Sequence, residues 1–175
     1  MPNTYIGTKL INAEPMTRAA YNAFRGWELP ENENGADEGY LVEYLDGGKP
    51  NTTTHAGYVS WSPKEQFDNA YRKTTGIPFG LAVEAVKKGK KIARAGWNGK
   101  GMWLAYVKPY TEAVHTGSTP CFCSRVFELP EGAQGDPKRA PEQLPYIAMK
   151  TADDKLVPWL ASQTDVLAED WNIVE

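Results

Sequence analysis

The spacing of hydrophobic positions in the N-terminal part of the chain predicts short helices and a β-hairpin. Apolar residues recur every four positions within 15–25, so this segment should form a helix that begins at its proline and has one apolar face. An acidic loop, 29–39, follows it. The runs 40–45 and 57–61, rich in tyrosine, valine and tryptophan, are typical of two paired strands. The Ser-Pro-Lys-Glu sequence at 62–65 has the form of a capping box and predicts that a further helix starts there.

The rest of the chain mixes the two periodicities again, with more strands. Residues 79–88 carry an apolar stripe at helical spacing and are followed by a glycine, which predicts a helix. Asn98-Gly99 is a strong hairpin-turn signal. The other expected elements are strands at 91–95, 102–107, 121–129, 146–150, 156–160 and 171–174, and a short helix from the capping box at 162–165 through residue 170. The expected fold class is α+β, with short helices packed on mostly antiparallel sheets.

A stretch of small polar residues and helix breakers, 73–78, is typical of a short linker and divides the chain into two small units, 1–76 and 77–175. The first unit has 7 basic and 10 acidic residues, a net charge of −3, and the second has 12 of each. We therefore expect two separate small units.

The composition excludes several classes of protein. With 19 basic and 22 acidic side chains, the chain lacks the basic excess of a surface that binds DNA or RNA through bulk charge. A content of 41 % hydrophobic residues suffices for a folded core. No run approaches the ~18 consecutive apolar residues of a membrane span. The first residues do not resemble a signal peptide, so we expect a soluble cytoplasmic protein.

Reactive side chains are few. The chain has two cysteines, at 121 and 123, and two histidines, His55 and His115, which are too few for a structural zinc site. Neither histidine lies in a nucleophile motif, and the usual glycine-rich phosphate loops are missing. Nothing in the sequence therefore points to a catalytic residue, a metal ion or a cofactor, although an enzyme stays an open alternative, and both histidines can be read as ordinary loop residues.

The most informative segment is Arg94-Ala95-Gly96-Trp97-Asn98-Gly99-Lys100-Gly101-Met102-Trp103. Its glycines let the backbone turn tightly and approach a ligand closely. The two tryptophans offer large faces for stacking on a base, and the arginine offers a fork of donors to phosphate. The alternative is a hairpin whose tryptophans close a small core, with the arginine solvated.

A second candidate is the polar junction at 159–165. After Trp159 it presents Ser162, Gln163, Thr164 and Asp165, which supply hydroxyls, an amide and a carboxylate at the expected start of a helix. Such a start suits an anionic group. The alternative is that the serine and the aspartate only cap the helix, which leaves the glutamine and the threonine unexplained.

Two further groups of residues have both a functional and a structural interpretation. The basic side chains between 87 and 94 either extend into solvent at the end of a helix or attract a phosphorylated ligand. In the first unit, polar and aromatic residues could line a candidate second pocket. These residues are Trp27, Glu43, His55, Tyr58 and Trp61.

Several long segments of the second unit carry a resemblance to a known family. They include Phe79-Gly80-Leu81-Ala82, the run 93–102, Trp159-Leu160-Ala161-Ser162-Gln163-Thr164-Asp165 and Leu167-Ala168-Glu169-Asp170-Trp171. Through these segments, residues 79–175 resemble the second type of Thoeris anti-defence protein, a phage family. Residues 5–72 look like a separate small module that recurs in phage genomes. The resemblance therefore implies that 1–76 is an N-terminal α+β accessory module and that 77–175 is the ligand-binding domain.

The resemblance implies a non-catalytic phage protein that acts in the host cell cytoplasm. Thoeris systems make glycocyclic ADP-ribose signals with a TIR enzyme, and the family binds the signal and leaves it intact. Some relatives also capture cyclic dinucleotides of the CBASS defence pathway. The resemblance also implies a homo-oligomer, typically a tetramer, with the ligand between subunits, and neither a nucleic acid polymer nor a membrane as partner.

This ligand suits the residues already singled out. Tryptophan would stack on the base, amide and carboxylate groups would bond base edges and ribose hydroxyls, and the arginine and the helix start would face the phosphates. The expected ligand-binding residues are Arg94, Trp97, Asn98, Trp103, Trp159, Ser162, Gln163, Thr164 and Asp165. The alternatives are an enzyme that degrades the same nucleotide and a protein–protein interaction module that binds none.

Overall fold

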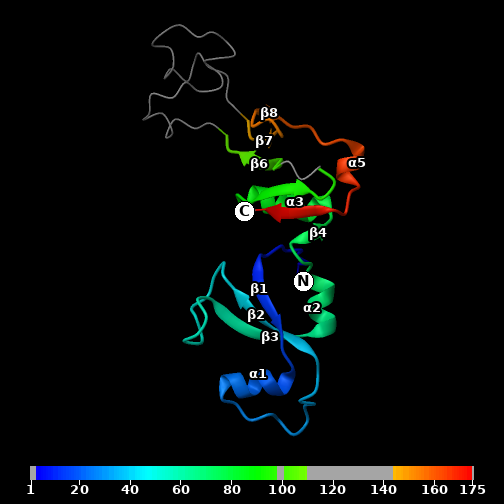
Figure 1. The fold of residues 1–175 in the computed structure, drawn as a ribbon. Helices are drawn as coiled ribbons and strands as arrows, with labels where there is room; N and C mark the ends of the chain where they lie inside the picture. Colours follow the sequence, from blue (N-terminus) through cyan, green and yellow to red (C-terminus); the bar gives the residue numbers. More distant parts are fainter. Residues whose placement is uncertain (1–2, 98–100, 110–143, 175) are drawn as a thin grey trace, which may run out of the picture. The chain divides into compact units, whose positions relative to one another are not determined.

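The computed structural model describes residues 3–97, 101–109 and 144–174. It divides into two compact units, Met1–Lys73 and Thr74–Glu175, each with its own sheet and helices (Figure 1). The predicted turn at Asn98-Gly99 and the predicted strand at 121–129 lie outside the described residues.

The first unit contains a three-stranded antiparallel sheet with the strand order β1-β2-β3. Its elements are β1 (Ile11–Pro15), α1 (Arg18–Arg25), β2 (Gly39–Tyr44), β3 (Tyr58–Pro63) and α2 (Lys64–Ala70). The pairing of β2 with β3 confirms the predicted hairpin. β1 is an additional strand that the sequence pattern did not predict.

The two helices of the first unit pack on opposite faces of its sheet. Leu41 and Val59 are buried against Tyr21 of α1. Tyr40, the neighbour of Leu41 along β2, stacks on Phe67 of α2, with ring centroids 4.0 Å apart and an interplanar angle of 22°. Because successive side chains of a strand point to opposite faces, both faces of this small sheet are covered in part by a helix.

Helix α1 begins at Arg18, so the predicted start at Pro15 is wrong. Pro15 is the last residue of β1 and is paired with Tyr40 of β2. Thr17 becomes the N-cap, and its hydroxyl oxygen accepts a hydrogen bond from the backbone N–H of Ala20 at 3.3 Å. The helical spacing predicted that a helix starts at Pro15, but this residue ends β1 because it pairs with β2.

The predicted capping box at 62–65 is also wrong. Ser62 lies within β3, opposite Tyr40, and its hydroxyl donates to the Pro63 carbonyl oxygen. Pro63 occupies the N-cap of α2 and provides no capping side chain. The sheet again extends further along the chain than the local pattern indicated.

The second unit contains a six-stranded sheet with the order β4-β9-β5-β6-β7-β8, in which each neighbouring pair is antiparallel. Its elements are β4 (Thr75–Ile77), α3 (Phe79–Lys87), β5 (Lys91–Arg94), β6 (Trp103–Val107), β7 (Tyr146–Lys150), β8 (Leu156–Pro158), α5 (Gln163–Val166) and β9 (Trp171–Val174). Together the two sheets and the short helices confirm the predicted α+β fold class.

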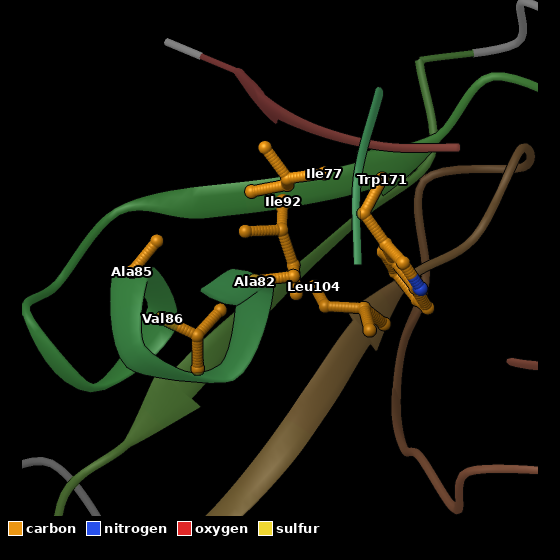
Figure 2. Close-up of a cluster of buried hydrophobic side chains, with 7 residues drawn as sticks. All are labelled: Ile77, Ala82, Ala85, Val86, Ile92, Leu104 and Trp171. Atoms are coloured by element: carbon orange, nitrogen blue, oxygen red, sulfur yellow. The ribbon is translucent and has the colours of Figure 1, made fainter. Parts of the chain in front are cut away.

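The core of the second unit lies between α3 and the central strands (Figure 2). Ile92 of β5 and Leu104 of β6 lie opposite each other in register, and neither side chain is exposed. Trp171 of β9 is also fully buried. The fully buried or nearly buried members of this cluster are Ile77, Ala82, Ala85, Val86, Ile92, Leu104 and Trp171.

Two features of the second unit differ from the sequence prediction. The expected linker at 73–78 contains β4, which pairs with β9. Helix α5 ends at Val166 and does not continue to residue 170. The indole N–H of Trp171 donates to the Asp165 carbonyl oxygen at 3.0 Å, and the chain leaves the helix at Leu167 so that β9 can begin.

Candidate ligand-binding site

The buried ring of Trp171 is the centre of an aromatic cluster. The Trp97 ring meets it edge-on, with centroids 5.6 Å apart at 76°, and the Trp159 ring does the same at 6.0 Å and 82°. Phe79 from α3 lies 5.4 Å from the same ring. Trp97 and Trp159 pack against the core, which for Trp97 agrees with the structural alternative, yet both remain partly exposed. They can therefore offer apolar surface to a ligand from a fixed position.

Arg94, at the end of β5, joins three parts of the chain beside this cluster. Its Nε donates to Asp170 Oδ1 at 2.7 Å and its Nη1 donates to Asp165 Oδ1 at 3.0 Å. The side chains are 22 % exposed for Arg94, 15 % for Asp165 and 36 % for Asp170. The hydrogen bonds to Asp170 and Asp165 raise the pKa of the arginine. Arg94 is thus held by two carboxylates and is not a freely solvated side chain.

The start of α5 is closed by the predicted capping box, which the structure confirms. The Ser162 hydroxyl oxygen accepts from the Asp165 N–H at 3.2 Å, and Asp165 Oδ2 accepts from the Ser162 N–H at 3.0 Å. Burial favours the neutral acid, but the bonds from Ser162 and Arg94 outweigh it and lower the pKa of Asp165. Gln163 and Thr164 project from this first turn as exposed side chains, as does Ser162.

Trp103 lies apart from this group. Leu104 points into the core under α3, so the preceding residue of β6 points to the opposite sheet face. There the Lys91 ammonium lies 5.1 Å from the centre of the Trp103 ring. The structure therefore brings together Arg94, Trp97 and Trp159 with residues 162–165 and leaves Trp103 on the other face. Asn98 lies outside the described residues.

The basic run between 87 and 94 does not form one patch in the described structure. Lys87 pairs with Glu84 on α3, at 3.1 Å. Lys91 and Arg94 flank the buried Ile92 on β5, and only Arg94 shares its sheet face. The basic residues of this run therefore lie in three separate places: at the end of α3, on the sheet face that carries Trp103, and beside Asp165 and Asp170.

Asp170 is a residue of this site that the sequence analysis missed. Its carboxylate holds Arg94, and this hydrogen bond is the main cause of its lowered pKa. The available signal was weak, because an acidic residue just before an expected strand has many ordinary roles. Its importance depends on the pairing of β5 with β9, which places Arg94 opposite Trp171.

In the first unit, two of the five candidate second-pocket residues have structural partners. Glu43, 8 % exposed, accepts hydrogen bonds from Asn12 Nδ2 and from the Gly57 N–H, each at 3.0 Å. These bonds hold its pKa below the ordinary value. The Trp61 indole N–H donates to the Met16 carbonyl oxygen at 2.8 Å. Both residues thereby connect β1, β2, β3 and the segment before α1.

Each of the other three candidates also has neighbours in the structure, and His55 lies close enough to Glu43 to help lower the pKa of that carboxyl. Trp27 is 53 % exposed, and the Arg25 guanidinium lies over its ring, 4.3 Å from the ring centre. His55 packs edge-on against Phe24, at 5.5 Å. Tyr58 lies on the opposite face of β3 from the next residue, which packs against α1. Tyr58 therefore lies on the other sheet face from Glu43 and Trp61, and the second pocket stays a prediction.

The described residues show neither a metal-binding cluster nor a membrane-spanning helix. Within them, no group of three or more histidine, cysteine, aspartate or glutamate side chains is arranged to hold a metal ion. No helix among the residues that the structure describes combines the length and apolar character needed to cross a membrane.

Comparison with known proteins places the second unit in a family. Residues 77–174 match the family model of the Thoeris anti-defense 2-like domain. A protein of Bacillus phage SP01, Thoeris anti-defense 2, is 39 % identical to this chain over 100 residues, which cover 57 % of this chain and 97 % of the relative. The chain belongs to the Thoeris anti-defense 2-like family, which confirms the resemblance found in the sequence. This membership supports a phage anti-defence role.

The arginine–carboxylate group leads to a prediction on stability and pH. We expect Arg94→Met to lower the free energy of unfolding at neutral pH by about 1.5–3 kcal/mol, the range for hydrogen bonds to charged groups. Exposure of Asp170 should keep the loss toward the lower end. The folded-state pKa values of both aspartates lie below the ordinary 3.8. Their contribution is therefore present above that pH and is lost as the pH falls through the lowered values.

Urea denaturation of both proteins at neutral pH and at about pH 3 checks this prediction. The difference in unfolding free energy between wild type and Arg94→Met should shrink at the acid pH, because below pH 3.8 the aspartates of the unfolded chain bind protons before those of the folded wild type do. An equal difference at both pH values would contradict the assignment.

Proposed function

We propose that the protein binds and sequesters a cyclic nucleotide immune signal, glycocyclic ADP-ribose in the first place, in the host cytoplasm without degrading it. One observation carries this proposal. Two partly exposed tryptophans, Trp97 and Trp159, rest on Trp171 beside an exposed polar turn, inside the segment that matches the Thoeris anti-defense 2-like family. The phage relative is named for anti-defence and not for an enzymatic activity.

The chemistry of the ligand suits this arrangement. Adenine would stack on a tryptophan face, which contributes roughly 1–3 kcal/mol per base. The Gln163 amide and the Thr164 hydroxyl are exposed and suit ribose hydroxyls and phosphate oxygens, whereas the exposed Ser162 hydroxyl is already bonded to Asp165 and Thr164 and would have to exchange a bond with the ligand. Arg94 and Asp165 are bonded to each other, so their main contribution would be to keep the turn in place. A site formed before binding loses little entropy when the ligand arrives.

We further infer a homo-oligomer, a tetramer by analogy with the family. Among the strands that the structure describes, β8 is at the edge of its sheet, and all three of its residues are exposed. Leu156 of β8 is 68 % exposed, and Leu160, two residues beyond the end of the strand, is 91 % exposed. An open edge strand with apolar neighbours favours pairing with another chain. In such an assembly Trp103, which lies on the other sheet face, could reach the ligand of a neighbouring copy.

This inference predicts that Leu160→Asp weakens self-association. A charge at this position would be buried without a partner in an interface that uses the β8 edge, so oligomers should dissociate at concentrations where the wild type is assembled. Analytical ultracentrifugation of both proteins gives the mass in units of the 19.4 kDa chain. Tyr5→Asp, at an 86 % exposed position in the first unit, is the control. A wild-type mass of one chain, or an unchanged mass in Leu160→Asp, would contradict the inference.

Calorimetry on the full chain tests the binding proposal. We expect saturable heat with glycocyclic ADP-ribose and weaker or no heat with linear ADP-ribose, because the preformed site suits a closed ring. Cyclic dinucleotides, a second class of ligand, are titrated in the same way. No heat and no thermal shift with any of these ligands would contradict the proposal and favour a protein–protein interaction module.

A further inference from the structure

We propose that Asp170 is a positioning residue that fixes Trp97 for stacking, an inference that rests on the proposed function. Three consecutive residues before Trp97 are bonded to Asp170. Its Oδ1 accepts from Arg94 Nε at 2.7 Å, its backbone oxygen accepts from the Ala95 N–H at 3.0 Å, and its Oδ2 accepts from the Gly96 N–H at 3.4 Å. One residue thus holds both the end of β5 and the turn that follows it.

The residue after Asp170 fixes the Trp97 ring itself. Trp171 is fully buried, and its ring meets the Trp97 ring edge-on with centroids 5.6 Å apart. The Trp97 N–H also donates to the Arg94 carbonyl oxygen at 3.2 Å, which closes the turn. Asp170 and Trp171, at the start of β9, therefore fix both the backbone and the ring of Trp97.

Both carboxylate oxygens of Asp170 are needed for this arrangement. One serves a guanidinium and the other a backbone amide, and both donors favour the ionised carboxylate, whose pKa is lowered. Asparagine has one acceptor oxygen and one NH₂ donor, so it can serve Arg94 or Gly96 but not both. Glutamate keeps two acceptor oxygens on a side chain that is one methylene group longer.

A loosened turn would cost affinity, because Trp97 would have to be ordered when the ligand binds. We expect Asp170→Asn to weaken binding of glycocyclic ADP-ribose about tenfold, which corresponds to about 1.4 kcal/mol. In the ligand-free protein we expect a smaller near-UV circular dichroism signal from the coupled Trp97 and Trp171 rings. Asp170→Glu should restore part of both properties.

The experiment compares full-length variants by calorimetry and near-UV circular dichroism. Trp97→Phe defines how much of the dichroism signal depends on Trp97. Ile92→Val removes one methylene group from the core, so it should lower the thermal midpoint while binding the ligand like the wild type. This variant separates a loss of position from a loss of stability.

Two results would overturn the positioning role. One is an Asp170→Asn variant that keeps both the wild-type affinity and the Trp97-dependent dichroism. The other is a loss of affinity in Ile92→Val that matches the loss in Asp170→Asn at equal thermal midpoints. If the wild type itself does not bind glycocyclic ADP-ribose, the proposed function fails, whereas the dichroism comparison still tests the positioning of Trp97.

Discussion

Replacing Trp171 by alanine is expected to lower the free energy of unfolding by about 3–5 kcal/mol, the range for removing a large buried aromatic side chain. The Trp171 side chain is fully buried. Three further aromatic rings, those of Phe79, Trp97 and Trp159, lie within 6.0 Å of its centroid. Its indole N–H also donates to the Asp165 carbonyl oxygen, so the substitution removes both packing and a link to α5.

Urea denaturation followed by far-UV circular dichroism measures this effect. Leu144→Ala is the control within the same unit, because this leucine is 70 % exposed and its loss should change the free energy of unfolding by no more than about 0.5 kcal/mol. A Trp171→Ala variant as stable as this control would show that the aromatic cluster does not support the domain.

Replacing Trp97 by alanine is expected to weaken binding of glycocyclic ADP-ribose by about one to two powers of ten, because the stacking surface for the base is lost. Trp159→Ala should have a similar effect, since both rings present partly exposed surface beside α5. Trp97→Phe, which keeps a smaller ring against Trp171, should bind with intermediate affinity. Calorimetry well below the thermal midpoint of each variant measures these values.

Tyr5→Ala is the control for the loss of an aromatic side chain, because Tyr5 is 86 % exposed and lies in the other unit. We expect it to bind like the wild type. Unchanged affinity in both Trp97→Ala and Trp159→Ala would show that the base is held elsewhere, for instance on the face that carries Trp103.

Local patterns were sufficient to predict most of the elements. The apolar stripe of α3, the hairpins β2–β3 and β7–β8, and the capping box of α5 are all determined by residues close together in the chain. β1 escaped prediction because Asn12, Ala13 and Glu14 are exposed and give no alternating pattern. That strand exists because it pairs with β2, which begins 24 residues after Pro15. Contacts of this range are not encoded in local spacing.

The same reasoning explains what was missed in the site. Arg94, Trp97, Trp159 and residues 162–165 were singled out from residue type and spacing, and the structure brings them together around Trp171. The role of Asp170 depends on a partner 76 residues earlier in the chain, and therefore on the strand order β9-β5. The position of Trp103 depends on which face of β6 is covered by helix α3. Neither property can be obtained from spacing alone.

Whether the protein captures the signal intact is best tested by letting it bind glycocyclic ADP-ribose and then releasing the ligand. The full chain is incubated with glycocyclic ADP-ribose, separated from unbound ligand, denatured by heat, and the released small molecules are analysed by mass spectrometry. We expect unmodified glycocyclic ADP-ribose to be recovered in proportion to the protein. Recovery of a cleaved product would contradict it in favour of a degrading enzyme, and recovery of no nucleotide would contradict binding itself.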